Sequence, residues 1–392
     1  MTFDPSHYIN DSIRAVRPSG IRKFFDLCAG SKDIISLGVG EPDFVSPWTI
    51  REACVYSLER GYTMYTSNYG LPELRHEIVK YLEDRFGLSY NEATDIIVTV
   101  GASEAIDMAL RALISPGDEV LIPEPCYVSY QACTLMSHGV PVPIVTTEEN
   151  GFRLTPADIE AKITPKSKVL ILSFPNNPTG AAMSRKELTA LAEVAKKHDL
   201  IVISDEIYCE LTYEKEPVSM ASIPGMKDRT IVVSGLSKSF AMTGWRVGYI
   251  ACHPDFIAEM VKIHQYTILC APIMGQKAAV EAFRNGRKEI EKMRAEYDHR
   301  RRYIVDRVKK IGIDMVTPEG AFYVFPSVKK FGLCSDEFAT RLLREQKVAV
   351  VPGTAFGESG EGFVRCSYAT SMKNIVEAFD RIEIFVNQLR KH

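Results

Sequence analysis

The sequence lacks long hydrophobic runs and any strong imbalance of charge. No apolar run approaches the roughly 18 residues that a membrane helix needs, and no apolar stretch follows a basic start at the N-terminus. The 47 basic and 50 acidic residues give a net charge of −3, which offers no electrostatic attraction for nucleic acid or an anionic membrane. We therefore expect neither a secretory signal nor a membrane or nucleic-acid partner.

Metal-binding patterns are also missing. The nine cysteines form no CxxC pair, and the eight histidines are scattered without metal-ligand spacing. An odd number of cysteines in a long chain is typical of small buried side chains in a reducing compartment. We expect a cytoplasmic protein without a metal site. With 392 residues, 46% of them hydrophobic, the chain is long enough for a sizeable core and for an enzyme of two domains.

Apolar runs of strand length alternate with helical patterns over the first two thirds of the chain. Several runs are almost pure Val, Ile and Leu, as in strands buried on both faces of a parallel sheet. One intervening helix, predicted at 184–198, opens with the capping-box pair Ser184 and Glu187. This order predicts a doubly wound α/β architecture. The predicted strands are 96–100, 120–123, 140–145, 169–174, 201–204, 231–234 and 247–251.

After about residue 285 the pattern changes to that of a smaller α+β domain. A long charged helix is predicted over 287–311, and three strands and two further helices follow it. The basic residues Arg300–Arg302 are predicted to form a solvated face of the long helix rather than an anion site.

A glycine pair near the N-terminus superficially suggests a dinucleotide-binding turn. Gly38 and Gly40 follow a short apolar run, but Pro42 and Asp43 occupy the turn, the third glycine is missing and no helix opens at once. We interpret this segment as a turn that brings the backbone close to another group.

Polar and aromatic residues follow five of the predicted buried strands. Ligands of open α/β sheets bind beyond the carboxyl ends of the strands, so we expect these residues to share one site. A small-residue turn at a helix N-terminus, together with Ser103, Ser237 and Arg246, suits a phosphate group.

Three further residues suit a flat ring with a ring nitrogen and an aldehyde group. Tyr127 would stack on a flat ring, Asp205 would hold a protonated ring nitrogen, and Lys238 would form a Schiff base. Phosphate, ring, ring nitrogen and aldehyde together describe pyridoxal 5′-phosphate.

The stretch GLSKSFAMTGWRVG, residues 235–248, closely resembles the cofactor-lysine signature of class I/II, fold type I, pyridoxal-phosphate-dependent aminotransferases. GEPDF, GASE, NPTG, SDEIY and GFVRCSYA match further blocks of that family in the family's order. The resemblance covers essentially the whole chain and is strongest to the prokaryotic aspartate, aromatic and N-acetyl-diaminopimelate branch. It implies a large domain with a seven-stranded, mostly parallel sheet between helices, plus a small α+β domain. We place an N-terminal arm joining the small domain at 1–45, the large cofactor-binding domain at 46–285 and the small domain at 286–392.

The resemblance also implies roles for individual residues. Lys238 resembles the Schiff-base lysine and Asp205 the partner of the pyridinium nitrogen, while Gly40 and Arg365 resemble the groups that hold the substrate α-carboxylate. Gly235 stands where some relatives have a serine, so Ser237 is assigned to the phosphate, with Ser234 as the second choice. The other implied residues are Ala102, Ser103 and Arg246 at the phosphate, Tyr127 on the ring and near the substrate, Asn177 at the ring hydroxyl and near the substrate, Tyr208 at the ring hydroxyl and, with Lys238 and Asp205, in catalysis, and Tyr65 at the phosphate of the neighbouring subunit.

The activity implied is transfer of an amino group from an L-amino acid to a 2-oxo acid, such as 2-oxoglutarate, by a ping-pong mechanism in a homodimer with composite sites. A β-lyase on the same scaffold is the alternative. A regulator of the same fold would need a DNA-binding domain, for which we expect no room because family-like sequence begins near residue 18.

The amino donor stays open between aspartate, aromatic amino acids, alanine and N-acetyl-diaminopimelate. Arg111 lies in the apolar stretch of the helix predicted at 102–114. A buried arginine needs a partner, either a structural carboxylate or the distal carboxylate of a dicarboxylic substrate. If Arg111 is structural, specificity is expected to reside around Ile21 and Arg22.

Overall fold

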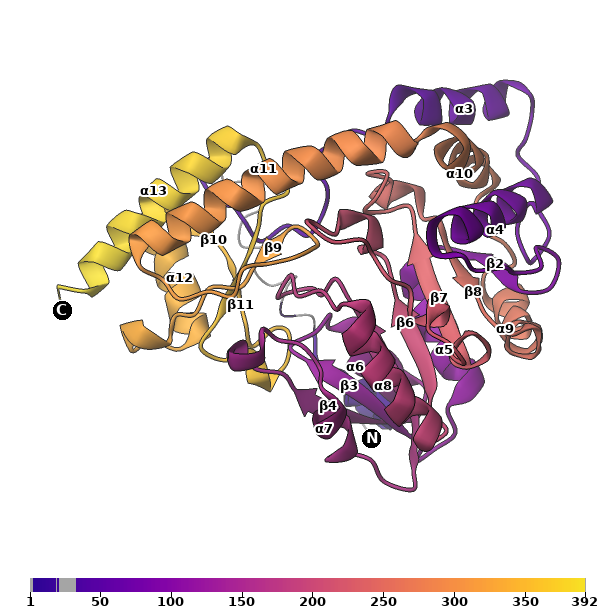
Figure 1. Ribbon diagram of the computed structural model, residues 1–392, viewed down its shortest axis with the longest axis horizontal. Coiled ribbons are helices and arrows are strands. Elements are labelled where there is room, and N and C mark those ends of the chain that lie inside the picture. Colours follow the sequence, from indigo (N-terminus) through magenta and orange to yellow (C-terminus); the bar gives the residue numbers. More distant parts are fainter. Residues whose placement is uncertain (1–2, 19, 21–32, 392) are drawn as a thin grey trace.

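A seven-stranded sheet forms the centre of the larger part of the molecule (Figure 1). The computed structural model describes residues 3–18, 20 and 33–391. The strands are β2 (Ile96–Thr99), β3 (Glu119–Glu124), β4 (Val140–Val145), β5 (Ser167–Ser173), β6 (Ile201–Asp205), β7 (Thr230–Gly235) and β8 (Gly248–Ala251). Their spatial order is β2-β8-β7-β6-β5-β3-β4. β8 runs opposite to the other six strands, so the predicted mostly parallel sheet is confirmed.

The burial of each strand follows from its composition and its place in the sheet. All residues of β2, β7 and β8 are buried, as expected for strands with helices on both faces. The edge strand β4 instead contains Pro141 and Pro143 and exposes several positions. A proline cannot donate to the sheet, so it is tolerated at an edge where no further strand pairs.

Helices cover both faces of this sheet. Leu170 packs with residues of α8 on one face, and the next residue, Ile171, packs with residues of α5 on the other. The α8 helix begins at the predicted capping box, in which Ser184 and Glu187 each bond the other's backbone N–H. The helices of this part are α3 (Trp48–Glu59), α4 (Pro72–Phe86), α5 (Ala102–Leu113), α6 (Ser129–Met136), α7 (Pro156–Glu160), α8 (Arg185–Lys197), α9 (Pro254–Thr267) and α10 (Ile273–Asn285).

The C-terminal part packs around one long helix. Figure 1 shows α11 (Arg287–Ile311) running from the side of α10 to that of the last helix, α13 (Met372–Leu389). A third helix, α12 (Ser335–Gln346), and three predicted strand regions complete this part, but the VAVVPG region is divided between two sheets. Its first half, β10 (Val348–Ala349), pairs with β1 (Ile35–Ser36), and its second half, β11 (Val351–Pro352), joins β12 (Val364–Ser367) and β9 (Tyr323–Val324). A short helix, α1 (Asp11–Arg14), lies near the N-terminus.

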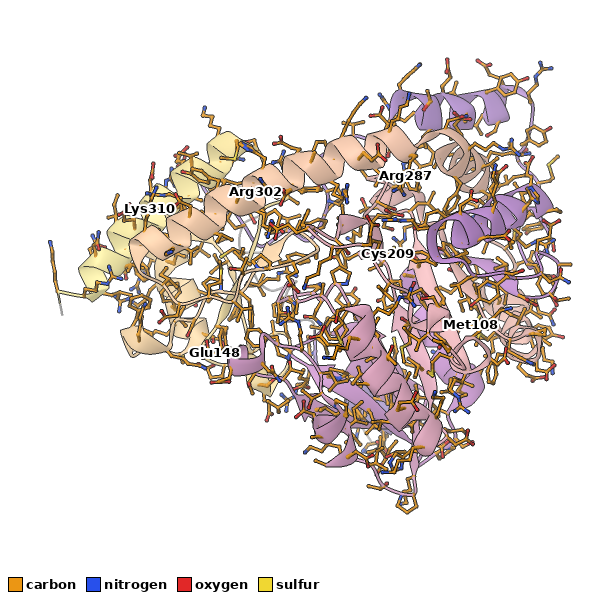
Figure 2. All side chains as sticks on the ribbon, in the orientation of Figure 1. Met108, Glu148, Cys209, Arg287, Arg302 and Lys310 are labelled. Carbon is orange, nitrogen blue, oxygen red and sulfur yellow. The ribbon has the colours of Figure 1, made fainter. Side chains whose placement is uncertain are left out.

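The prediction of a solvated Arg300–Arg302 face is wrong for two of its three residues. Arg300 and Arg301 are 5% and 3% exposed. Arg300 donates both to Asp43, at 2.8 Å, and to Glu296, while Arg301 pairs with Asp298 at 2.7 Å. Arg302, labelled on α11 in Figure 2, is exposed as predicted. A helical charge pattern alone does not reveal that a distant segment supplies a carboxylate partner.

Burial was also predicted for the cysteines, and the structure confirms it for five of them. Cys126, Cys133, Cys209, Cys252 and Cys366 are buried, whereas Cys54 and Cys270 are half-buried. Cys334 is exposed, because its backbone begins α12 and its Sγ accepts a hydrogen bond from the N–H of the third helical residue.

The described residues contain neither a membrane-spanning helix nor a metal-binding cluster. None of the helices in the described part of the chain is both long and apolar enough to cross a membrane. Within residues 3–18, 20 and 33–391, no cluster of three or more His, Cys, Asp or Glu side chains is placed to hold a metal ion.

Candidate active site

A cavity of about 660 Å³ lies beyond the carboxyl ends of β5, β6 and β7. It brings together segments from the start of the chain, from the large sheet and from the C-terminal part. Of the predicted site residues, only Tyr65 does not line it. The predicted residues that line the cavity are Gly40, Ala102, Ser103, Tyr127, Asn177, Asp205, Tyr208, Ser237, Lys238, Arg246 and Arg365.

Lys238 lies in the turn after β7 and presents a buried amine to the cavity. Its Nζ donates a hydrogen bond to the carbonyl oxygen of Gly40 at 2.7 Å. The pKa of Lys238 is lowered to about 8, mainly by burial and in part by the positive charges of Arg365 and Arg246, against the opposing charges of Glu41 and Asp205. The neutral amine, which is the nucleophilic form, is therefore accessible near neutral pH.

Asp205 ends β6 and is 5% exposed. Its Oδ2 accepts a hydrogen bond from Tyr130 Oη at 2.7 Å, and its Oδ1 accepts one from the backbone N–H of Ile207 at 3.2 Å. Burial raises the pKa of Asp205 to about 6, although both hydrogen bonds and the charge of Lys238 favour the carboxylate. Asp205 is thus a carboxylate at neutral pH that is held in place for a cationic partner.

The raised pKa predicts how stability depends on pH in the chain free of ligands. Between the ordinary pKa of 3.8 and about 6, the folded chain holds the Asp205 proton more tightly than the unfolded chain does. The free energy of unfolding contributed by Asp205 is fully present below pH 3.8 and is lost as the pH rises through 6. Relative to Asp205→Asn, wild type should lose stability over this window in denaturant titrations. An identical pH dependence of the two proteins would contradict the raised pKa.

Arg365 is a buried guanidinium whose protein partners are all neutral. The residue is 1% exposed, its Nη1 donates to Asn177 Oδ1 at 2.9 Å, and its Nη2 donates to the carbonyl oxygen of Gly38 at 2.6 Å. Its Nε has no hydrogen-bond partner, and its charge lies 4.5 Å from the centre of the Tyr323 ring. No carboxylate of the described residues forms an ion pair with it. Because an unpaired buried charge is costly, the site is suited to an anionic ligand.

The N-terminus of α5 and Arg246 form a second anion-binding corner. Ala102 and Ser103 open the helix and line the cavity, while Gly101 occupies the cap position. Ser103 therefore acts as no helix cap, and no side-chain cap bond is present. Arg246 donates to the carbonyl oxygens of Thr243 and Val100 at 3.0 and 3.3 Å. Free helix N–H groups beside a guanidinium favour an anion such as phosphate.

The structure confirms the predicted close backbone approach of the Gly38–Gly40 segment, although this segment is irregular rather than a turn. The carbonyl oxygens of Gly38 and Gly40 accept hydrogen bonds from Arg365 and Lys238. A Cβ atom added to Gly40 would lie 2.6 Å from Tyr323 Oη, so a larger residue would displace the aromatic ring. Glycine thus lets this segment pass directly over the cavity.

Two tyrosines of the site were not identified from the sequence. Tyr130 bonds Asp205, and Tyr323 Oη lies 2.8 Å from Tyr208 Oη while its ring faces Arg365. Neither position is part of a motif that marks it as functional. For Tyr130 the spacing could have indicated a place in the site, because it follows Tyr127 by three residues and the two rings meet edge to face.

Two residues considered for function lie away from the cavity. The side chain of Arg111 is 44% exposed and pairs with Asp107 one helical turn away, at 2.7 Å. Arg111 therefore has the structural carboxylate partner that was one of its two expected partners. The other role, binding the distal carboxylate of a substrate, assumed a buried arginine, and Arg111 is exposed. Tyr65 is 80% exposed. Ile21 and Arg22 lie outside the described residues.

Comparisons with known proteins identify the family of the chain. The sequence profile of the family "Aminotransferase class I and II" matches residues 32–382. YugH of Bacillus subtilis (strain 168), named as an aminotransferase, is 53% identical over 97% of this chain and 99% of its own length. The aspartate aminotransferase of Pyrococcus abyssi is 47% identical over 96% of this chain and 97% of its own.

A solved structure extends the similarity to the fold. The crystal structure of an aromatic aminotransferase from Pyrococcus horikoshii OT3 superimposes with a TM-score of 0.90 at 43% identity, covering 95% of this chain and 99% of the other. The profile match and the near full-length identity show that the chain belongs to the class I and II aminotransferases, which depend on pyridoxal 5′-phosphate.

Proposed function

We propose that Arg365 holds the α-carboxylate of an L-amino acid in this cavity while Lys238 moves the substrate proton, so that the amino group passes to a 2-oxo acid such as 2-oxoglutarate. The observation that carries this proposal is the buried Arg365 guanidinium, which has only neutral protein partners. A carboxylate would supply the missing counter-charge and, by a bidentate contact, would fix the orientation of the amino acid.

The chemistry of the cavity fits pyridoxal 5′-phosphate. The guanidinium groups of Arg246 and Arg365 form no ion pair with a carboxylate of the described residues, so they suit two anionic groups, and the Asp205 carboxylate suits the protonated ring nitrogen. When bound, the cofactor supplies a sink for the electrons of the breaking Cα–H bond. The residues that would hold it are Ala102, Ser103, Ser237 and Arg246 at the phosphate, Tyr127 on the ring, Asn177 and Tyr208 at the ring hydroxyl, Asp205 at the ring nitrogen and Lys238 at the aldehyde carbon, as a Schiff base.

The residues of the chain divide the work of proton transfer. Lys238 Nζ would take the proton from Cα as a general base and would deliver it, as a general acid, to the former aldehyde carbon of the cofactor. Its lowered pKa, about 8, suits both roles near neutral pH. The Asp205 carboxylate keeps a proton on the ring nitrogen by its negative charge, and Tyr130 holds that carboxylate in place. The Gly38–Gly40 segment orients two of these groups, because its carbonyl oxygens accept hydrogen bonds from Lys238 and Arg365.

A ping-pong cycle follows, because the amino group must stay on the enzyme between the release of one oxo acid and the arrival of the next. The β-lyase alternative finds no support among the relatives, which are named as aminotransferases. It would show itself by release of ammonia and pyruvate without an amino acceptor.

Replacement of Arg365 by lysine tests the carboxylate site. Arg365→Lys should raise KM for every amino acid alike, by about 10- to 100-fold, because a lysine cannot form the bidentate contact that all α-carboxylates share. Arg111→Lys is the matched control and should leave all kinetic constants near wild type, because Arg111 is exposed and outside the cavity. Steady-state kinetics with aspartate, phenylalanine and alanine would measure this. An effect of Arg365→Lys confined to one substrate class would contradict the assignment.

The preferred amino donor is the open part of the proposal. Relatives of similar identity are named for aspartate and for aromatic substrates. Mixing the cofactor-loaded enzyme with each amino acid singly, and following the spectral change to the pyridoxamine form, would rank the donors without a second substrate.

We also propose a cytoplasmic homodimer whose sites use Tyr65 of the partner subunit. Support comes from the segment between residues 45 and 65, which exposes many large hydrophobic side chains. Monomeric proteins seldom expose such groups together, so this segment suits an interface between subunits. The division into an N-terminal arm (1–45), a large domain (46–285) and a small domain (286–392) is part of the same proposal. The pairing of β1, in the arm, with β10, in the small domain, supports the joining of the arm to the small domain. The exposed side chains in question are Val45, Trp48, Val55, Tyr56, Leu58, Tyr62, Met64 and Tyr65.

Complementation between two impaired variants tests the composite site. When Tyr65→Phe and Lys238→Ala proteins are mixed, exchange of subunits should raise activity above the sum of the parents. A heterodimer would then carry one site with both defects and one with neither. Light scattering and activity would be followed together. Demonstrated exchange without recovery of activity would mean that Tyr65 acts within its own subunit or not at all.

A further inference from the structure

Glu104, which is half-buried, and His264, which is buried, form a hydrogen-bonded pair directly behind the N-terminus of α5. Glu104 is the third residue of this helix, and His264 lies on α9, which packs against it. The His264 Nδ1 and Glu104 Oε1 atoms are 2.6 Å apart, and His264 is 0% exposed. Neither residue lines the cavity, and the proposed chemistry uses neither of them.

The pair has a defined polarity. A carboxylate only accepts hydrogen bonds, so the Nδ1 atom of His264 carries the hydrogen and donates it. The Nε2 atom of the same ring is buried without a hydrogen-bond partner. A leucine would fill this place without leaving a buried polar atom unsatisfied, so the contact with Glu104 is the feature that a histidine adds.

The second oxygen of Glu104 reaches the turn that forms the phosphate corner. Its Oε2 accepts a hydrogen bond from the backbone N–H of Val100, while the carbonyl oxygen of Val100 accepts one from Arg246 Nη2 at 3.3 Å. Thr99 Oγ1 also donates to the carbonyl oxygen of Gly101, at 3.0 Å. The turn leading into Ala102 is therefore held from both sides, by Glu104 behind it and by Arg246 in front.

We propose that Glu104 and His264 are positioning residues that hold this turn so that the N–H groups of Ala102 and Ser103 point at the cofactor phosphate. This inference rests on the proposed phosphate site. A carboxylate in the first helical turn would repel a phosphate dianion if its side chain could rotate toward the cavity. The hydrogen bond from α9 keeps the Glu104 charge on the far side of the turn.

Binding measurements on the full-length chain freed of cofactor would test this. Pyridoxal 5′-phosphate and pyridoxal differ only in the phosphate, so the ratio of their dissociation constants reports on the phosphate corner. His264→Leu and Glu104→Ala should weaken pyridoxal 5′-phosphate by about tenfold or more and change pyridoxal by no more than about twofold. His264→Asn, which can place an N–H near the position of Nδ1, should restore most of the affinity.

The chain offers a matched control pair. His76 and Glu92 lie at a similar distance, 2.7 Å, but both side chains are exposed and away from the cavity. His76→Leu should leave both dissociation constants unchanged. Inorganic phosphate gives a second readout, because it should raise the unfolding temperature of wild type and of His76→Leu but not that of Glu104→Ala.

The outcomes separate this inference from the proposed function. Equal weakening of both ligands, or unchanged affinity for pyridoxal 5′-phosphate, would overturn the positioning role. Should Glu104→Ala and His264→Leu fail to fold, Glu104→Gln decides the matter. The glutamine side chain keeps an oxygen that can accept from the Val100 N–H, but it lacks the negative charge beside His264. An unaltered ratio of the two dissociation constants in this variant would refute the positioning role of Glu104 and His264. A wild type that binds both ligands equally would instead refute the phosphate corner itself.

Discussion

Replacement of Lys238 by alanine is expected to abolish steady-state transamination. Lys238 is the amine that the cavity presents in a buried position with a pKa lowered to about 8, and it is proposed both to attach the aldehyde and to carry the proton. Loss of a general acid–base alone lowers rates by about 10²- to 10⁴-fold, and loss of the attachment adds to this. The measurement is kcat with a saturating amino donor and acceptor.

Two observations would accompany that loss. The Lys238→Ala protein should still bind pyridoxal 5′-phosphate, because the phosphate and ring contacts remain, and it should lack the absorbance of an internal imine. Reduction of the wild type with borohydride should attach the cofactor to the peptide that contains Lys238. Attachment to a peptide from any other lysine would refute the assignment.

Replacement of Asp205 by alanine should slow proton abstraction while leaving the fold nearly intact. Asp205 is proposed to keep the ring nitrogen protonated, and removing one such stabilising group raises the barrier by about 3 kcal/mol, roughly 150-fold in kcat. Burial raises the pKa of this carboxyl, so the chain without cofactor should not lose stability at neutral pH when Asp205 is removed.

Single-turnover kinetics with an α-deuterated amino acid would isolate this step. The Asp205→Ala protein should show a larger isotope effect than wild type, because proton transfer becomes fully rate-limiting. Tyr130→Phe is the graded control. It keeps the carboxylate but removes the hydrogen bond at 2.7 Å, so it should lie between wild type and Asp205→Ala. An Asp205→Ala protein within a few-fold of wild-type kcat would contradict the role at the ring nitrogen.

The strands and the main helices were predictable from local pattern. Buried runs such as Ile201–Asp205 contain almost only β-branched and aliphatic residues, because both of their faces lie against helices. The predicted helix at 287–311 has the same bounds in the structure, since Gly286 and Gly312 flank a continuous helical pattern. Local signals of this kind arise within a few residues and need no knowledge of the rest of the chain.

Errors and omissions arose where a residue's partner lies far away in the sequence. Arg300 was expected to be solvated, but its partner Asp43 is 257 residues away and closes over it. Tyr130 and Tyr323 were not singled out, because the atoms they bond, on Asp205 and Tyr208, belong to distant segments of the chain. Arg111 shows the reverse case, since its partner Asp107 lies one turn away on the same helix.

By itself the sequence determined the class of fold, the family and the residues proposed to carry covalent and charge chemistry, because Lys238, Asp205, Arg246 and Arg365 occur in motifs that follow the order of one family. The tertiary structure alone decided how these groups are tuned. Burial lowers the pKa of Lys238 and raises that of Asp205. Arg365 is buried without a counter-ion among the described residues, and hydrogen bonds hold Glu104 between His264 and the Val100 backbone. Desolvation and hydrogen bonding depend on every neighbour that folding brings into contact, whereas a motif records only the neighbours along the chain.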